Sequence, residues 1–232
     1  MKTSSKLLIA LAICLVAAMF IAAISIRHQY DSIDKNDLYT RWKKQPLSPF
    51  RVLQVSGPSA ARLQVEPGKT ARMLADTLND QSHVVYTTRV LHDTLFLHIE
   101  AINDWPLDPN DLDDGAYYPQ LIVQTPTLMA VQVQNANCQI VDVQSESLVI
   151  RQLGEAGKVR LANLHVGQLT ASLQAHNQLT IAAPANDIAN ATITVSDSAR
   201  LFQYVDFRRG MTLTASPAAT LRLTGKALRQ VR

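Results

Sequence analysis

The sequence has only two cysteines and eight glycines among its 232 residues, and it contains none of the short motifs that mark common catalytic sites. Cys14 lies inside an apolar N-terminal run and Cys138 in an expected strand, so the two cysteines do not form a structural disulfide. There is no Gly-x-Ser-x-Gly elbow, no phosphate-binding glycine loop and no His-Glu-x-x-His pair. We therefore expect no catalytic residues, no bound cofactor and no metal ligands, and interpret Cys138 as a small buried apolar residue.

An excess of charge is also lacking. The chain carries 22 basic and 19 acidic residues, but Lys2 and Lys6 precede the apolar N-terminal run, which leaves 20 basic against 19 acidic. This balance gives no electrostatic reason to expect a nucleic-acid partner. A hydrophobic content of 47% with only 18% charged residues is instead typical of a chain that buries a sizeable core.

The first long feature that is present is an uncharged run at residues 7–26, LLIALAICLVAAMFIAAISI. Twenty helical residues span about 30 Å, the thickness of the hydrocarbon core of a bilayer. With Lys2 and Lys6 before it, this run predicts a signal-anchor over residues 1–26, with the N-terminus in the cytoplasm. We expect a single-pass membrane protein, with a polar juxtamembrane linker over residues 27–48 and a C-terminal domain that is exported across the membrane.

Cleavage of this segment is the alternative. The run exceeds the 7–15 apolar residues of an ordinary signal peptide, which favours a retained anchor. However, Ala23-Ile24-Ser25 has the small-x-small pattern of a cleavage site. Cleavage after Ser25 would leave an exported, soluble protein.

Residues 49–232 are rich in short stretches in which apolar and polar residues alternate. A period of two in pieces of three or four residues, recurring about every ten residues, predicts an all-β domain. His92-Asp93 is expected to form a turn between strands at 84–90 and 94–99. In the second half, the expected strands are 122–123, 131–133, 140–143, 148–150, 159–161, 169–173, 179–181 and 193–195.

The alternating segments also resemble a bacterial envelope family, the auto-transporter adhesin head domain, or GIN domain. The resemblance covers about residues 50–225 and implies a right-handed parallel β-solenoid-like fold with no established active site. Together with the N-terminal segment, it implies a protein of the bacterial inner membrane whose C-terminal domain lies in the periplasm. Glycines are fewer than that family uses at its corners, and we expect Asn135–Asn137, Ala175–Asn177 and Ala185–Asp187 to take those places, since Asn and Asp tolerate a left-handed backbone. The segments that carry the resemblance are Phe50–Gly57, Ala61–Val65, Asp93–Ile99, Ile122–Leu128, Val131–Ala136, Leu148–Ile150, Gly157–Leu161, Leu169–Leu173 and Leu221–Gly225.

Three groups of polar residues are candidates for binding. His165 and His176 are interpreted as surface or turn histidines rather than ligands that meet on adjacent rungs. The carboxylates Asp104, Asp108, Asp111, Asp113 and Asp114 form a loop that is either solvated or a calcium site, and the spacing fits no EF-hand. The basic residues Arg208, Arg209, Lys226, Arg229 and Arg232 either protect a sheet edge or bind anionic glycans or lipid headgroups.

Two functions follow from these features. The first is a membrane-anchored, non-catalytic binding or adhesion module, whose polar outer face contacts a glycan or protein ligand. The second is a structural scaffold or sensor domain of a membrane-protein complex. A polysaccharide-active enzyme would need a row of carboxylates on one face. The available acids, Asp142, Glu146, Glu155, Asp187 and Asp197, are spread too thinly to form one.

Overall fold

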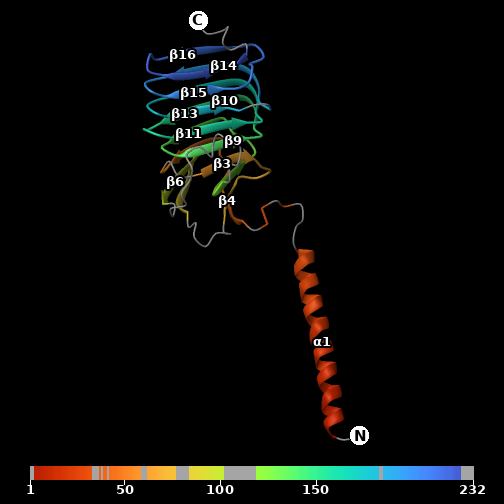
Figure 1. Cartoon of the computed structure of the whole chain (residues 1–232). Helices are drawn as coiled ribbons and strands as arrows, with labels where there is room; N and C mark the ends of the chain where they lie inside the picture. Colours follow the sequence, from red (N-terminus) through yellow and green to blue (C-terminus); the bar gives the residue numbers. More distant parts are fainter. Residues whose placement is uncertain are drawn as a thin grey trace. The chain divides into compact units, whose positions relative to one another are not determined.

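The computed structural model describes residues 3–32, 37, 39–40, 42–58, 62–76, 84–101, 119–182 and 185–225. The chain divides into two compact units, residues 1–41 and residues 42–232. The first unit contains the only described helix, and the second contains every described strand (Figure 1).

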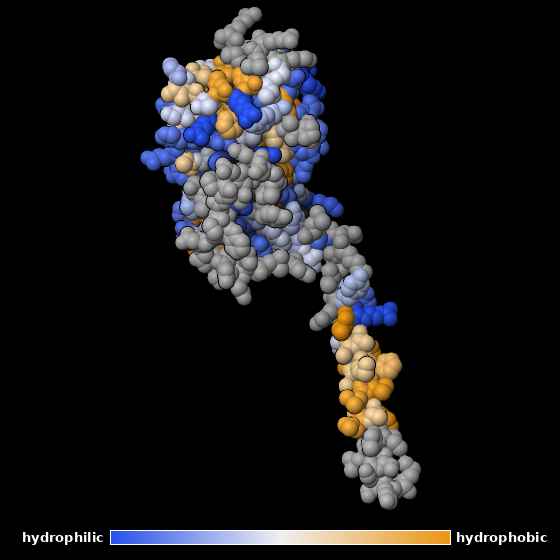
Figure 2. Space-filling view, viewed as in Figure 1, coloured by the Kyte–Doolittle hydropathy of each residue, from blue (hydrophilic) through white to orange (hydrophobic). Residues whose placement is uncertain are grey.

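The N-terminal unit consists of helix α1 (Thr3–Ser32). The window Leu11–His28 is long and apolar enough to cross a membrane, and its residues are exposed on the helix surface (Figure 2). The helix continues six residues past the predicted anchor, and Arg27 and Asp31 lie 3.7 Å apart on its last turns. The apolar helix is therefore consistent with either a membrane anchor or a signal sequence.

The second unit consists of two sheets of mostly parallel strands. Sheet A contains β1 (Lys43–Pro46), β4 (Arg72–Ala75), β7 (Leu121–Thr125), β3 (Arg62–Pro67), β9 (Asn137–Val141), β11 (Lys158–Ala162), β13 (Gln178–Ile181), β15 (Arg200–Gln203) and β17 (Thr220–Leu223), in this spatial order. Sheet B contains β16 (Gly210–Ala215), β14 (Asp187–Val195), β12 (His165–Leu173), β10 (Gln144–Leu153), β8 (Ala130–Gln134), β2 (Val52–Ser56), β6 (Thr94–Ala101) and β5 (Val85–Leu91).

From β8 onwards the chain alternates between the two sheets, and each strand pairs in parallel with the strand two places further along. In sheet B, Val131 aligns with Ile150, which aligns with Ala171, so the register advances by 19 to 22 residues per step. We call one sheet-B strand with the sheet-A strand that follows it a layer. The layers β8/β9 to β16/β17 are stacked in chain order (Figure 1).

The first layers do not follow chain order. β2 pairs with both β6 and β8, and β3 pairs with both β7 and β9. The layer β2/β3 therefore lies between β6/β7 and β8/β9, and the chain passes over it from β7 to β8. Antiparallel strands finish this end of both sheets, since β5 pairs with β6, and β4 and β1 extend sheet A beyond β7. The predicted turn at His92-Asp93 is confirmed between β5 and β6.

The core lies between the two sheets and is built from the inward residues of every layer. All eight segments predicted in the second half lie in strands, with the exception that Asp142 and Val143 follow the end of β9. The prediction of three- or four-residue strands is wrong for β10, β12 and β14, which have 10, 9 and 9 residues. Polar residues at their ends, such as Asp187 and Gln144, still pair along the sheet, which the alternation of apolar residues does not reveal.

Several chain corners adopt a left-handed backbone without glycine. Asn135 has φ 58° and Ala175 has φ 51°, as predicted for two of the three expected corners. The third, Ala185–Asp187, has no residue with positive φ. Asp142, Asn163 and Asp197 adopt the same conformation at other corners, with φ between 53° and 59°. Asn and Asp side chains accept this conformation more readily than alanine does.

Ala175 is consequently a strained position, and Ala175→Gly is expected to increase the stability of the protein. The left-handed conformation costs an alanine about 1–2 kcal/mol, while glycine adds about 0.5–1 kcal/mol of unfolded-state entropy. We therefore expect the free energy of unfolding to rise by about 0.5–1 kcal/mol, measured by urea titration. Ala162→Gly is the matched control, since Ala162 lies in the extended strand β11, and it is expected to lower stability.

Candidate functional site

The outer face of sheet A is closed over part of its area. Leu74 and Ile122 align with each other and alternate along their strands with the core residues Met73 and Val123. They therefore point away from the core, yet only 0% and 1% of their surface is exposed. Thr180, an outward residue of β13, is also buried. These parts of sheet A offer no open surface to a ligand.

The polar residues near this end of sheet A bind one another. Gln124, which is 5% exposed, donates to Glu66 and accepts a hydrogen bond from the Nε of Arg72. Gln64 Nε2 also donates to Glu66 Oε2 at 2.7 Å. These contacts satisfy buried polar groups across β4, β7 and β3, and we interpret them as part of the structure rather than a binding site.

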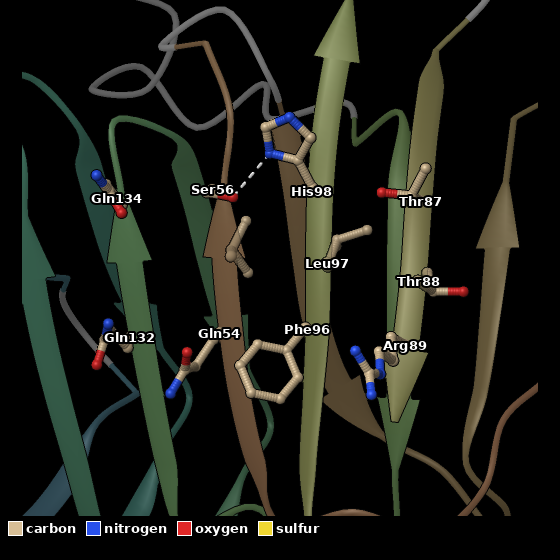
Figure 3. A pocket seen from close by; sticks show the side chains of 11 residues that line it. Gln54, Ser56, Thr87, Thr88, Arg89, Phe96, Leu97, His98, Gln132 and Gln134 are labelled. Carbon is tan, nitrogen blue, oxygen red and sulfur yellow. Dashed lines mark hydrogen bonds between the residues drawn. The ribbon is translucent and has the colours of Figure 1, made fainter. Parts of the chain in front are cut away.

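The outer face of sheet B, in contrast, is open. Strand register places Arg89, Phe96, Gln54, Gln132 and Arg151 side by side on the adjacent strands β5, β6, β2, β8 and β10. We call these five residues the cross-strand row. Arg89, Phe96 and Arg151 are exposed, and the two glutamines are half-buried. Figure 3 shows the first four side chains in one line across the strands.

A second line runs parallel to the first. It lies two residues later on β6, β2 and β8, and two residues earlier on the antiparallel strand β5. It contains Thr87, His98, Ser56 and Gln134. The hydroxyl of Ser56 and Nδ1 of His98 lie 2.8 Å apart and form a hydrogen bond (Figure 3). Together the two lines border a shallow groove of about 320 Å³. Among the described residues that line it are one phenyl ring, one arginine and one histidine, and none of these lining residues is a carboxylate.

Beyond Arg151 the same face carries hydroxyl groups. Register continues the cross-strand row into Ser172, Thr194 and Thr214 on β12, β14 and β16. A neighbouring line contains Thr170, Thr192 and Thr212. Five of these six side chains are exposed, and Ser172 is half-buried. Sheet B therefore presents polar side chains on its outer face in all of its layers, with a groove at one end.

The described residues that the sequence indicated as candidates for binding lie outside the groove and the cross-strand row. His165 and His176 are both exposed. His165 is the first residue of β12 and His176 follows the other end of this nine-residue strand, so the structure does not bring them together. His165 lies 3.8 Å from Asp187, which also pairs with Arg208 at 2.7 Å. Asp142 and Asp197 occupy left-handed corners. The five dispersed acids form no row on one face.

Residues 104–114 and the tail residues Lys226, Arg229 and Arg232 lie outside the described residues, so the calcium and tail hypotheses remain predictions. Among the residues that the structure does describe, no three His, Cys, Asp or Glu side chains are grouped to hold a metal ion. The sequence analysis did not predict the cross-strand row. One signal was present, because Phe96 occupies the outward phase of a strand whose inward residues are Leu95 and Leu97.

Cys138 is confirmed as a buried core residue of β9, and burial raises the pKa of its thiol to about 12. The thiol therefore stays protonated at neutral pH and is a poor nucleophile. In a Cys14→Ala variant we expect no reaction with a thiol reagent at pH 8, and complete reaction after unfolding in urea. The Cys138→Ala variant gives the contribution of Cys14. Rapid labelling of the folded Cys14→Ala variant would contradict the burial of Cys138.

No family model matches the sequence, and no curated protein matches it. A putative lipid binding protein from Parabacteroides distasonis has a TM-score of 0.34 and 10% identity, covering 79% of this chain and 97% of that chain. A putative adhesin from Bacteroides fragilis also has a TM-score of 0.34, with 12% identity over 78% of this chain and 94% of that chain.

A putative cell adhesion protein from Clostridium sporogenes has a TM-score of 0.29 and 8% identity, covering 78% of this chain and 97% of that chain. The structurally similar proteins therefore include several adhesins by name. TM-scores this low do not establish a common fold, and we infer no function from them. The resemblance to the GIN domain stays a prediction.

Proposed function

We propose that this chain is a cell-envelope protein whose β domain binds an extracytoplasmic partner, without catalysis, through the outer face of sheet B. One observation carries the proposal. The strand register aligns polar side chains in lines on an exposed sheet face, whereas the outer face of sheet A is buried at Leu74 and Ile122. A flat, regular surface suits an extended ligand, whereas catalysis ordinarily requires a cleft with converging acid and base groups.

The domain is proposed to be a right-handed parallel β-solenoid-like fold of the adhesin-head type. The regular alternation of the chain between two sheets, with a register step of 19 to 22 residues, supports a coiled path. The right hand is the usual one for crossovers between parallel strands. Helix α1 is proposed to anchor the chain in the bacterial inner membrane, with the β domain in the periplasm.

The anchor is tested on cells that produce the chain. A retained anchor places the protein in the membrane fraction after alkaline carbonate extraction, with an intact mass that includes residues 7–26. Release of a soluble chain that begins after Ser25 would contradict the anchor and favour a cleaved signal sequence.

The binding function is tested with the full chain in detergent micelles, against envelope and host glycans, matrix proteins and calcium. Substitutions on the sheet-B face, such as Gln132→Ala, are compared with Thr220→Ala on sheet A. We expect a saturable ligand whose affinity falls only with the sheet-B variants. A folded, monodisperse sample that binds nothing in the panel would instead favour the alternative, a scaffold or sensor domain of a membrane-protein complex.

A further inference from the structure

We infer that the cross-strand row binds a linear acidic polysaccharide, such as a chain of uronic acids, with the sugar chain lying across the strands. This inference rests on the proposed binding function and names its ligand class. It is carried by three features of the row: an exposed aromatic ring, two adjacent amides, and at each end an arginine that forms no ion pair with a described residue.

The aromatic ring is Phe96. It lies between Arg89 and Gln54 in the row, with 39% of its surface exposed. Its neighbours Leu95 and Leu97 point into the core, so Phe96 itself contributes little to the packing between the sheets. The C–H face of a sugar ring is apolar and flat, and stacking it on the phenyl ring would remove this exposed surface from water.

The amides are Gln54 and Gln132, aligned on β2 and β8 next to Phe96. Each amide supplies an acceptor oxygen and an NH₂ donor. Sugar hydroxyls both donate and accept hydrogen bonds, so a pair of amides beside an aromatic ring matches a ring and its hydroxyls. Figure 3 shows both amides on the same side of the sheet as the phenyl ring.

The arginines give the charge preference. Neither Arg89 nor Arg151 forms an ion pair with any described residue, and none of the described residues that line the groove is a carboxylate. Glu100 is exposed further along β6, past His98 and off the row. A guanidinium binds a carboxylate through two parallel hydrogen bonds. The row therefore complements an anionic ligand rather than a neutral or basic one.

The spacing favours a chain over a single sugar. Arg89 and Arg151 lie on strands that are four strand spacings apart, which corresponds to about 19 Å. A short oligosaccharide stacked on Phe96 reaches Arg89, whereas only a longer one also reaches Arg151. The affinity of a uronate oligomer is thus expected to increase with length until both arginines are engaged.

The test uses the full chain in detergent micelles and alginate oligouronates of defined length, with neutral cello-oligosaccharides as the uncharged probe, measured by calorimetry. Phe96→Ala is expected to weaken binding of short and long uronates about tenfold. Arg89→Gln is expected to weaken both by a similar factor, and Arg151→Gln to weaken only the long ones. Binding of the wild type is expected to fall as NaCl is raised.

The matched control is the double variant Arg208→Gln, Arg209→Gln, which removes the same charge as Arg89→Gln, Arg151→Gln but lies outside the row. If the control loses uronate binding and the row variant keeps it, the inference is overturned. If uronates do not bind but another ligand is lost in Phe96→Ala, the inference fails while the binding function stands. If no ligand depends on sheet B, both fail. Unchanged melting temperatures show that the exposed substitutions leave the fold intact.

Discussion

Replacing Leu201 by alanine is expected to lower the free energy of unfolding by about 3–5 kcal/mol. Leu201 lies in β15 with none of its surface exposed, and it aligns between Leu179 of β13 and Leu221 of β17. Removing its side chain loses the burial of the deleted carbons and leaves a cavity between the two sheets. Strands β13 and β17 pair with β15 on both sides of this position. A urea titration followed by far-UV circular dichroism measures the change.

Leu221→Ala is the matched control, because it removes the same atoms from the same line of the core. Leu221 belongs to the last layer, and 36% of its surface is exposed. We expect a loss of about 1 kcal/mol or less. Equal losses at the two positions would contradict the end position of β17 in sheet A. A loss below 1 kcal/mol at Leu201 would contradict a core that lies between the two sheets.

The contrast between these two leucines shows how far the sequence predicts the fold. Leu201 and Leu221 are each preceded by a polar residue, Arg200 and Thr220, and they differ in the residue that follows, which is Phe202 or Arg222. Alternation reports which side of a strand faces the core, and it correctly predicted β7 to β14. It did not predict β15 to β17, which include the strands of these two leucines. It carries no information about the number of layers stacked beyond a strand, and that number determines burial.

The order of the first layers could not be predicted from the alternation of apolar and polar residues either. Val52 of β2 aligns with both Thr94 of β6 and Ala130 of β8. The first strand of sheet B in chain order therefore lies between two later strands. Any apolar alternation fits next to any other in a parallel sheet, since the side-chain period is the same throughout. Corners were also ambiguous, because Asp142 lies between Val141 and Val143 and reads as an outward strand residue, although its φ is 59°.

The candidate binding face depended on this missing information. Alternation alone identifies Gln54, Phe96 and Arg151 as outward residues, but each lies in a different segment of the chain. Only the register of five strands brings them into one row with Arg89 and Gln132. The sequence motifs instead indicated histidines and acidic residues as candidates, and in the structure these lie dispersed among corners and strand ends.

Polar residues inside the domain make the second large contribution to stability, and Asn186 is the clearest of them. It is 8% exposed at the corner before β14. Its Oδ1 accepts a hydrogen bond from the N–H of Leu164 at 2.8 Å, and its Nδ2 donates to the carbonyl oxygens of Leu161 at 2.9 Å and Ala182 at 2.6 Å. One side chain thus joins the corner after β13 to the corner of the preceding layer, where no regular strand pairing exists.

Asn186→Ala is therefore expected to lower the free energy of unfolding by about 2–4 kcal/mol. The N–H of Leu164 is buried and loses its acceptor, and an unsatisfied buried group costs about 1–3 kcal/mol. The carbonyl of Leu161 loses less, because it still accepts from the N–H of Ala182. Asn190→Ala is the matched control on the strand that follows, since Asn190 of β14 is half-buried and points outward, and it should change stability by about 0.5 kcal/mol or less.

The comparison of the two asparagines separates a structural amide from a merely polar one. If both alanine variants lose the same small amount, water replaces the Asn186 amide and the corners are held by strand pairing alone. A large loss at Asn186 alone, with an unchanged dependence of the free energy on urea, shows that this amide joins adjacent layers. Asparagine at this corner would then do by hydrogen bonding what glycine does elsewhere by conformational freedom, which accounts for a chain of stacked corners with so few glycines.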